Sequence, residues 1–176
     1  MSKVTNQGET DRVGLRSNAY YRQLAEKAIT ELGQMEPPVP MDGLAALYRI
    51  PVRLVKMPGF FHGAIINEDG LPVIVLNSVK DEYVRRVTLA HMLGHVFIVL
   101  NDSEYTYPRD RSLEHPEADV IADELLMPAK LVAEEAQKWF NDYRYLARMF
   151  GVTEQDMMSR MRDLGIIKAQ GIMWDY

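Results

Sequence analysis

Apolar residues recur with helical spacing in the first third of the chain. The series Leu24, Ala25, Ala28, Ile29 and Leu32 stops at Gly33, where a C-terminal glycine is expected, so the pattern predicts a helix from Ser17 to Leu32. The prolines of residues 37–40 predict a rigid extended connector. A short apolar helix over residues 41–48 should follow it and end before Pro51.

The pattern then changes to short runs of β-branched and aliphatic residues. Residues 52–55, 64–66 and 72–76 read as three strands. Between the last two, residues 67–70 end in Asp-Gly, a pair that suits the positive φ angles of a hairpin turn. The sequence therefore predicts a small sheet that contains at least one hairpin.

Helical spacing returns after the third strand. Ser78 with Asp81 resembles an N-cap box that opens a long helix carrying His91 and His95. A polar loop over residues 101–113 separates it from helices over 116–127 and 128–139, and residues 145–167 predict two helices around a turn at 151–153, with Thr153 as N-cap. The fold class is α+β, helix-rich with a three-stranded sheet.

Composition limits the remaining possibilities. With 176 residues, 47% of them hydrophobic, the chain can bury a core; we expect a flexible arm over 1–16, a main domain over 17–140 and a helical segment over 141–176 packed on it. The absence of cysteine excludes disulfides and thiolate ligands. Without an apolar leader or membrane span, we expect a soluble cytoplasmic protein. The net charge of −5 argues mildly against nucleic-acid binding over the whole surface.

His91 and His95 are the first candidates for chemistry. Residues four apart on a helix project from one face, and this is the spacing with which a helix offers two nitrogens to one zinc ion. A third histidine, His115, follows in a chain that has only four. The alternative is a partly buried structural pair of histidines.

Met92 occupies the position that decides the chemistry. In an HExxH site a glutamate follows the first histidine and transfers the proton during hydrolysis, whereas a thioether neither accepts nor donates one. Met92 is most simply an apolar filler, and a soft copper ligand beside three histidines is a minor alternative. The residues thus support metal binding better than hydrolysis.

Four blocks of sequence identify a family resemblance. They are Pro38-Val39-Pro40, Arg86 to His91 with Gly94-His95, Ala118 to Pro128 with its Leu-Leu-Met-Pro ending, and Phe150 to Thr153 with Arg160-Met161 and Leu164-Gly165. In this order they resemble the ImmA/IrrE family of metallopeptidases. The resemblance implies a zincin-like domain with a gluzincin-like zinc site, encoded by prophages, mobile elements or stress systems and acting on helix-turn-helix transcriptional repressors as protein partners.

The resemblance also assigns roles to residues. His91 and His95 match the two histidine ligands, and Asp119 matches the residue that orients one of them. His115 stands where the family has a glutamate ligand, and Pro116 after it suggests that its side chain enters from the helix N-cap. Glu114 or Glu117 would substitute if the register shifts.

Other side chains near the predicted site have two readings each. Tyr105 and Tyr107 either donate to an oxyanion or only pack a loop against the body. Glu82, Glu104, Glu114 and Glu117 are the carboxylates from which a replacement base would come, although no spacing selects one. His62, in a flexible Gly-Phe-Phe stretch, reads as an ordinary exposed histidine.

Three functions follow from these residues. The first is an ImmA/IrrE-type protein that recognises a repressor partner with hydrolysis weak or absent, a pseudopeptidase. The second is a working metallopeptidase that uses another carboxylate or the metal hydroxide alone. The third is a DNA-binding regulator using residues 144–168, whose helix-turn-helix-like pattern would present a basic face made of Arg144, Arg148, Arg160, Arg162 and Lys168.

Overall fold

The computed structural model describes residues 16–33, 36–108 and 115–168. The described part has the helix-rich α+β architecture that the sequence predicts, with one three-stranded sheet. The helices are α1 (Asn18–Leu32), α2 (Met41–Leu47), α3 (Glu82–Asn101), α4 (Pro116–Leu126), α5 (Ala129–Lys138), α6 (Tyr143–Phe150) and α7 (Glu154–Asp163). The arm expected over residues 1–16 lies outside this part, apart from Arg16.

The sheet has the strand order β1–β3–β2, with β1 (Val52–Val55), β2 (Gly63–Glu68) and β3 (Leu71–Asn77). β2 and β3 form the predicted antiparallel hairpin, and its turn has positive φ at Asp69 and Gly70. β1 runs parallel to β3, which is therefore central. The central strand is also the most buried, since residues 73–77 are all buried.

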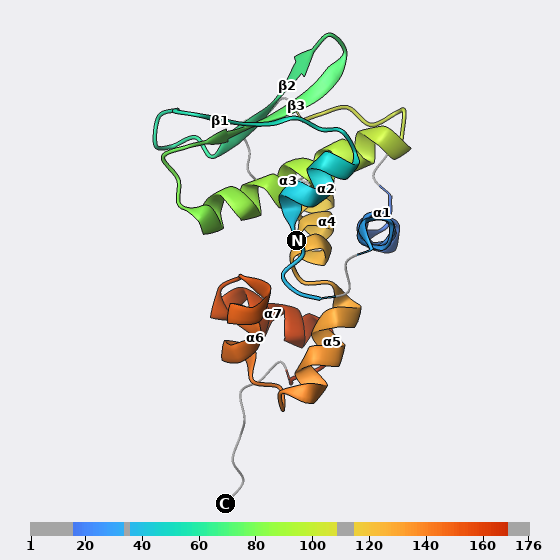
Figure 1. Ribbon diagram of the computed structural model, residues 1–176. Helices are drawn as coiled ribbons and strands as arrows, with labels where there is room; N and C mark the ends of the chain where they lie inside the picture. Colours follow the sequence, from blue (N-terminus) through green and yellow to red (C-terminus); the bar gives the residue numbers. More distant parts are fainter. Residues whose placement is uncertain (1–15, 34–35, 109–114, 169–176) are drawn as a thin grey trace, which may run out of the picture.

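Helix α3 is the centre of the molecule. It packs against the sheet on one side and against α4 on the other, and Figure 1 shows it running beneath the strands. Its middle, from Thr88 to Ile98, is almost wholly buried. The residues of the metal-binding spacing therefore stand on a helix whose position is fixed from both sides.

Two local predictions were wrong. The N-cap of α3 is Asp81, whose carboxylate accepts from the Val84 N–H at 2.8 Å, so Ser78 precedes the helix in a turn. A side chain caps best when it reaches the N–H two or three residues on, which Asp81 does. The connector before α2 is also bent at residues 36–38 instead of extended, with a cis Pro37–Pro38 bond.

The C-terminal helices lie at the opposite end of the molecule from the sheet (Figure 1). The predicted turn separates α6 from α7, with Gly151 left-handed at φ 64° and Thr153 capping α7. Arg86 of α3 reaches this turn and donates to the Gly151 carbonyl at 3.0 Å, and also to the Val39 carbonyl at 3.3 Å. One side chain thus links α3 to the segments that precede α2 and α7.

Candidate metal centre

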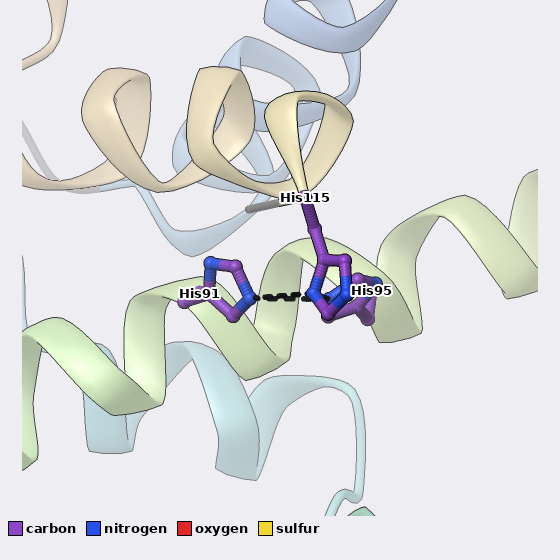
Figure 2. A group of neighbouring side chains, drawn as sticks. All are labelled: His91, His95 and His115. Atoms are coloured by element: carbon purple, nitrogen blue, oxygen red, sulfur yellow. Dashed lines mark hydrogen bonds between the residues drawn. The ribbon is translucent and has the colours of Figure 1, made fainter. Parts of the chain in front are cut away.

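Three histidines from two helices meet at one point. His91 and His95 project from the same face of α3, and His115 is the N-cap of α4 (Figure 2). Pro116 at the first helical position disfavours the α conformation before it, and His115 has φ −119° and ψ 82°. As predicted, its side chain enters from the helix start, and it descends between the helices onto the other two rings (Figure 2).

The ring nitrogens form a triangle of the size that a metal ion requires. His95 Nε2 lies 3.1 Å from His91 Nε2 and 3.1 Å from His115 Nδ1, and the third side is 3.4 Å. Tetrahedral zinc with nitrogen ligands at about 2.0–2.1 Å would separate those nitrogens by about 3.3 Å. The three histidines are therefore already spaced as ligands of one ion.

Hydrogen bonds behind two of the rings set which nitrogen carries the proton. Asp119 Oδ1 accepts from His91 Nδ1 at 2.8 Å, so the lone pair of His91 is on Nε2. His95 Nδ1 lies 2.8 Å from the Tyr105 hydroxyl, which donates to Glu117 Oε1 at 3.0 Å. Since that hydroxyl donates to the carboxylate, its oxygen accepts from His95 Nδ1–H.

Both Nε2 lone pairs consequently point into the triangle. Two lone pairs facing each other across 3.1 Å repel, and a cation between them converts the repulsion into coordination. Asp119 holds the outer nitrogen of His91 directly, and Glu117 acts on that of His95 through the Tyr105 hydroxyl. Such partners also increase the basicity of the ligands. The donor set fits a divalent transition metal for which imidazole is a suitable ligand.

Met92 follows His91 on α3 and is half-buried, packed against the hydrophobic core. Its thioether has no titratable proton, so it does not perform the transfer expected of a glutamate at this position. Its packing agrees with the reading of an apolar filler.

Among the described residues, none of the other carboxylates that the sequence singled out belongs to the group of three histidines. Glu117 is 3% exposed and is bound to Tyr105 on the outer side of His95. Glu82 and Glu104 are exposed. Glu114 lies outside the described residues.

Tyr105 and Tyr107 differ in what they contact. The Tyr105 hydroxyl is engaged with His95 and Glu117, behind a histidine. Tyr107 is half-buried, and burial raises the pKa of its phenol. Together with Val99, Thr106 and Pro108 they line a cavity of about 340 Å³. His62 is exposed in the loop before β2, as expected, and takes no part in the cluster.

Sequence reasoning missed two features of this centre. One is the Tyr105–Glu117 pair behind His95; the only signal was the position of Glu117 between His115 and Asp119 in α4. The other is Gly94, where a Cβ would lie 2.8 Å from the Ala118 carbonyl oxygen, so glycine there lets α3 and α4 approach closely.

The predicted basic face of the C-terminal helices was wrong at one residue. Arg160 is 7% exposed; its guanidinium forms a buried ion pair with Glu124 of α4 and donates to the Met127 carbonyl at 3.0 Å. A guanidinium used in this way is not available to a phosphate backbone. Arg144, Arg148, Arg162 and Lys168 are the exposed or half-exposed members that remain.

Two packed helices, α3 and α4, thus bring three histidines together as a candidate metal centre. The chain belongs to the peptidase family M78, described as the IrrE N-terminal-like domain, which matches residues 49–161. This range contains the three histidines, the residues that support them and the Glu124–Arg160 pair. The ImmA/IrrE resemblance is thereby confirmed.

A similar fold occurs in a transcriptional regulator of Mycobacterium tuberculosis. The structural match has a TM-score of 0.57 at 20% identity, and covers 82% of this chain and 46% of that one. The chain thus spans less than half the length of that regulator. No curated protein sequence matches the chain.

Among the helices that the structure describes, none has the length and apolar character needed to span a bilayer.

Proposed function

We propose that this chain is a zinc-binding ImmA/IrrE-type protein that regulates by recognising a helix-turn-helix repressor as its partner, with peptide hydrolysis weak or absent. His91, His95 and His115 would hold the ion, with Asp119 orienting His91. The single observation that carries the proposal is that Met92 occupies the position of the general base, next to three histidines whose nitrogens are all spaced as metal ligands.

The geometry of the three nitrogens supports the metal. Their separations of 3.1–3.4 Å are those of ligands around one ion, and the hydrogen bonds to His91 and His95 turn two lone pairs inward. Zinc in such a site supplies Lewis acidity, which polarises a carbonyl and makes water more acidic. Three histidines serve this purpose as well as two histidines and a carboxylate.

Met92 supports the loss of hydrolysis. Removing a positioned general base typically reduces the rate by about 10²–10⁴-fold. Glu117, the buried carboxylate next to the centre, is bound to Tyr105 behind a ligand. The alternative is a working metallopeptidase that uses another carboxylate as its base, and the test must distinguish it from a protein without hydrolytic activity.

The partner class rests on the family. The resemblance to the ImmA/IrrE family, to whose IrrE N-terminal-like domain the chain belongs, implies action on helix-turn-helix repressors. A domain that retains fold and metal without its base can still bind and sequester such a partner. Direct DNA binding is the weaker reading, because the guanidinium of Arg160 forms a buried ion pair with Glu124 and is not available to a phosphate.

The test restores the missing base. Met92→Glu should gain cleavage of denatured casein, or of a member of a panel of purified helix-turn-helix repressors, by at least about 10²-fold over the parent. The chelator 1,10-phenanthroline should abolish the gain. Met92→Gln is the matched control, because it has nearly the same shape as glutamate without a base, and it should remain as inactive as the parent.

A parent that already cleaves as fast as Met92→Glu, and loses that activity on chelation, would show a working peptidase and refute the proposal. Repressor binding is measured separately, by titrating the same panel against the zinc-loaded parent. Failure of every repressor to bind would remove the partner from the proposal.

A further inference from the structure

Tyr105 lies ten residues after His95, beyond the end of α3. A hydrogen-bonded turn at residues 102–105 places its side chain next to His95. Asp102, the C-cap residue, is the centre of this turn. Its carboxylate accepts from the Glu104 N–H and from Arg16 Nε, both at 3.1 Å, and its carbonyl accepts from the Tyr105 N–H at 3.2 Å. The turn directs the Tyr105 side chain along α3 towards His95.

The hydroxyl of Tyr105 then joins two buried groups from different helices. It lies 2.8 Å from His95 Nδ1 and 3.0 Å from Glu117 Oε1, and both partners are 3% exposed. Water does not readily replace a hydrogen bond at such depth. By contrast, the side chain of Asp119, which holds His91, is 54% exposed, so solvent can take over part of its role.

The N-terminal end of α4, from its N-cap His115 to Asp119, therefore contributes to the positioning of all three histidines. It supplies a ligand, His115, and at alternate positions the two carboxylates that hold the other ligands: Glu117 through Tyr105, and Asp119 directly. Carboxylates in the first turn of a helix are also favoured by its dipole. Both supporting carboxylates thus come from the helix that His115 caps, and only His91 contacts its carboxylate directly.

We propose that Tyr105 and Glu117 are positioning residues that act in series: Glu117 orients the Tyr105 hydroxyl, and the hydroxyl holds His95 in the tautomer that presents Nε2 to the metal. This inference deepens the proposed function and rests on it for the identity of the metal. The tautomer itself is a property of the metal-free protein.

Zinc affinity tests the consequence. Tyr105→Phe keeps the ring and removes only the hydroxyl, and it should weaken zinc binding about 10–100-fold, as loss of a group that supports a ligand does. Affinity is measured by competition with a chromophoric chelator. Tyr107→Phe is the matched control, because Tyr107 lines the same cavity as Tyr105, and it should bind zinc as the parent does.

The imidazole nitrogen-15 shifts of the metal-free protein test the cause. At about pH 8, where histidines are neutral, the parent and Tyr107→Phe should show His95 protonated on Nδ1. In Tyr105→Phe the Nε2–H tautomer should become populated. A purely structural role for Tyr105 would change stability without moving this equilibrium.

Glu117→Gln and the double variant test the series arrangement. Glu117→Gln should weaken zinc binding in the same direction, and Tyr105→Phe/Glu117→Gln should be no weaker than the worse single variant, because both substitutions break one chain of bonds. Unchanged His95 tautomers in both single variants would overturn the proposal, as would fully additive losses. A parent that takes up no zinc would refute the proposed function instead. The tautomer experiment, done on the metal-free protein, would still show whether Tyr105 and Glu117 position His95.

Discussion

Met92 differs from a glutamate in chemistry more than in length. It is half-buried on α3 and contacts the core, so a glutamate there would be partly desolvated. We expect Met92→Glu to lower the free energy of unfolding by about 1–3 kcal/mol. Thermal and urea unfolding measure this cost alongside the cleavage assay.

The metal content of Met92→Glu shows whether the substitution leaves the three histidine ligands in place. Because the three ligands are unchanged, Met92→Glu should bind zinc with the stoichiometry of the parent. A variant that folds but loses the metal would show that the side chain at position 92 shapes the ligand triangle.

At the residue scale the sequence predicted what depends on local spacing. His91 and His95 are one helical turn apart, so their shared face follows from helix geometry. Pro116 indicated how His115 enters, by restricting the residue before it. The Tyr105–Glu117 pair could not be predicted from the sequence. It depends on a turn at Asp102 that places the Tyr105 hydroxyl between His95 of α3 and Glu117 of α4.

Among the elements, the contact between α3 and α4 determines whether the centre forms. At Gly94 an added Cβ would meet the Ala118 carbonyl oxygen at 2.8 Å and its Cα at 3.2 Å, both backbone atoms that cannot rotate away. α4 would have to move, and His115 moves with it.

Gly94→Ala should therefore lower the free energy of unfolding by about 1–3 kcal/mol through overpacking. It should also weaken zinc binding, since the third ligand is displaced. Gly59→Ala is the control, because no atom lies within 4 Å of the Cβ it would add, and it should change neither quantity. Parent-like zinc affinity in Gly94→Ala would mean that the helices separate without disturbing the site.

Most elements, but not their pairing, could be predicted. Helical periods, the Asp69-Gly70 turn and the Thr153 cap are local signals, and the structure has each of them. The cap of α3 was misplaced by three residues, at Ser78, because both Ser78 and Asp81 are good capping residues. Strand order is non-local: β1 pairs with β3 and not with β2, the next strand in the sequence, and no spacing in the sequence reveals this.

On the scale of the whole molecule, a buried ion pair joins the C-terminal helices to the metal-binding part. Glu124 of α4 accepts from Arg160 of α7 and, at 2.8 Å, from the Ala129 N–H that begins α5. Both side chains are nearly inaccessible, at 1% and 7% exposure. The helix that carries the support of the metal site is thus also the helix that anchors α7.

Arg160→Ala should lower the free energy of unfolding by about 3–5 kcal/mol, because it leaves the Glu124 charge buried without its partner. Arg162→Ala, on the exposed side of the same helix, should change it by less than about 0.5 kcal/mol. Chemical unfolding compares the two. Equal and small effects would show that the ion pair does not hold α7 in place.

The most direct test of the account is the metal content of the purified chain. Elemental mass spectrometry of the parent, after incubation with zinc and removal of excess, should find about one zinc per chain, and a folded His91→Ala/His95→Ala variant should hold none. Absence of stoichiometric metal from the parent, under conditions where circular dichroism shows it folded, would contradict the central claim that His91, His95 and His115 form a metal centre.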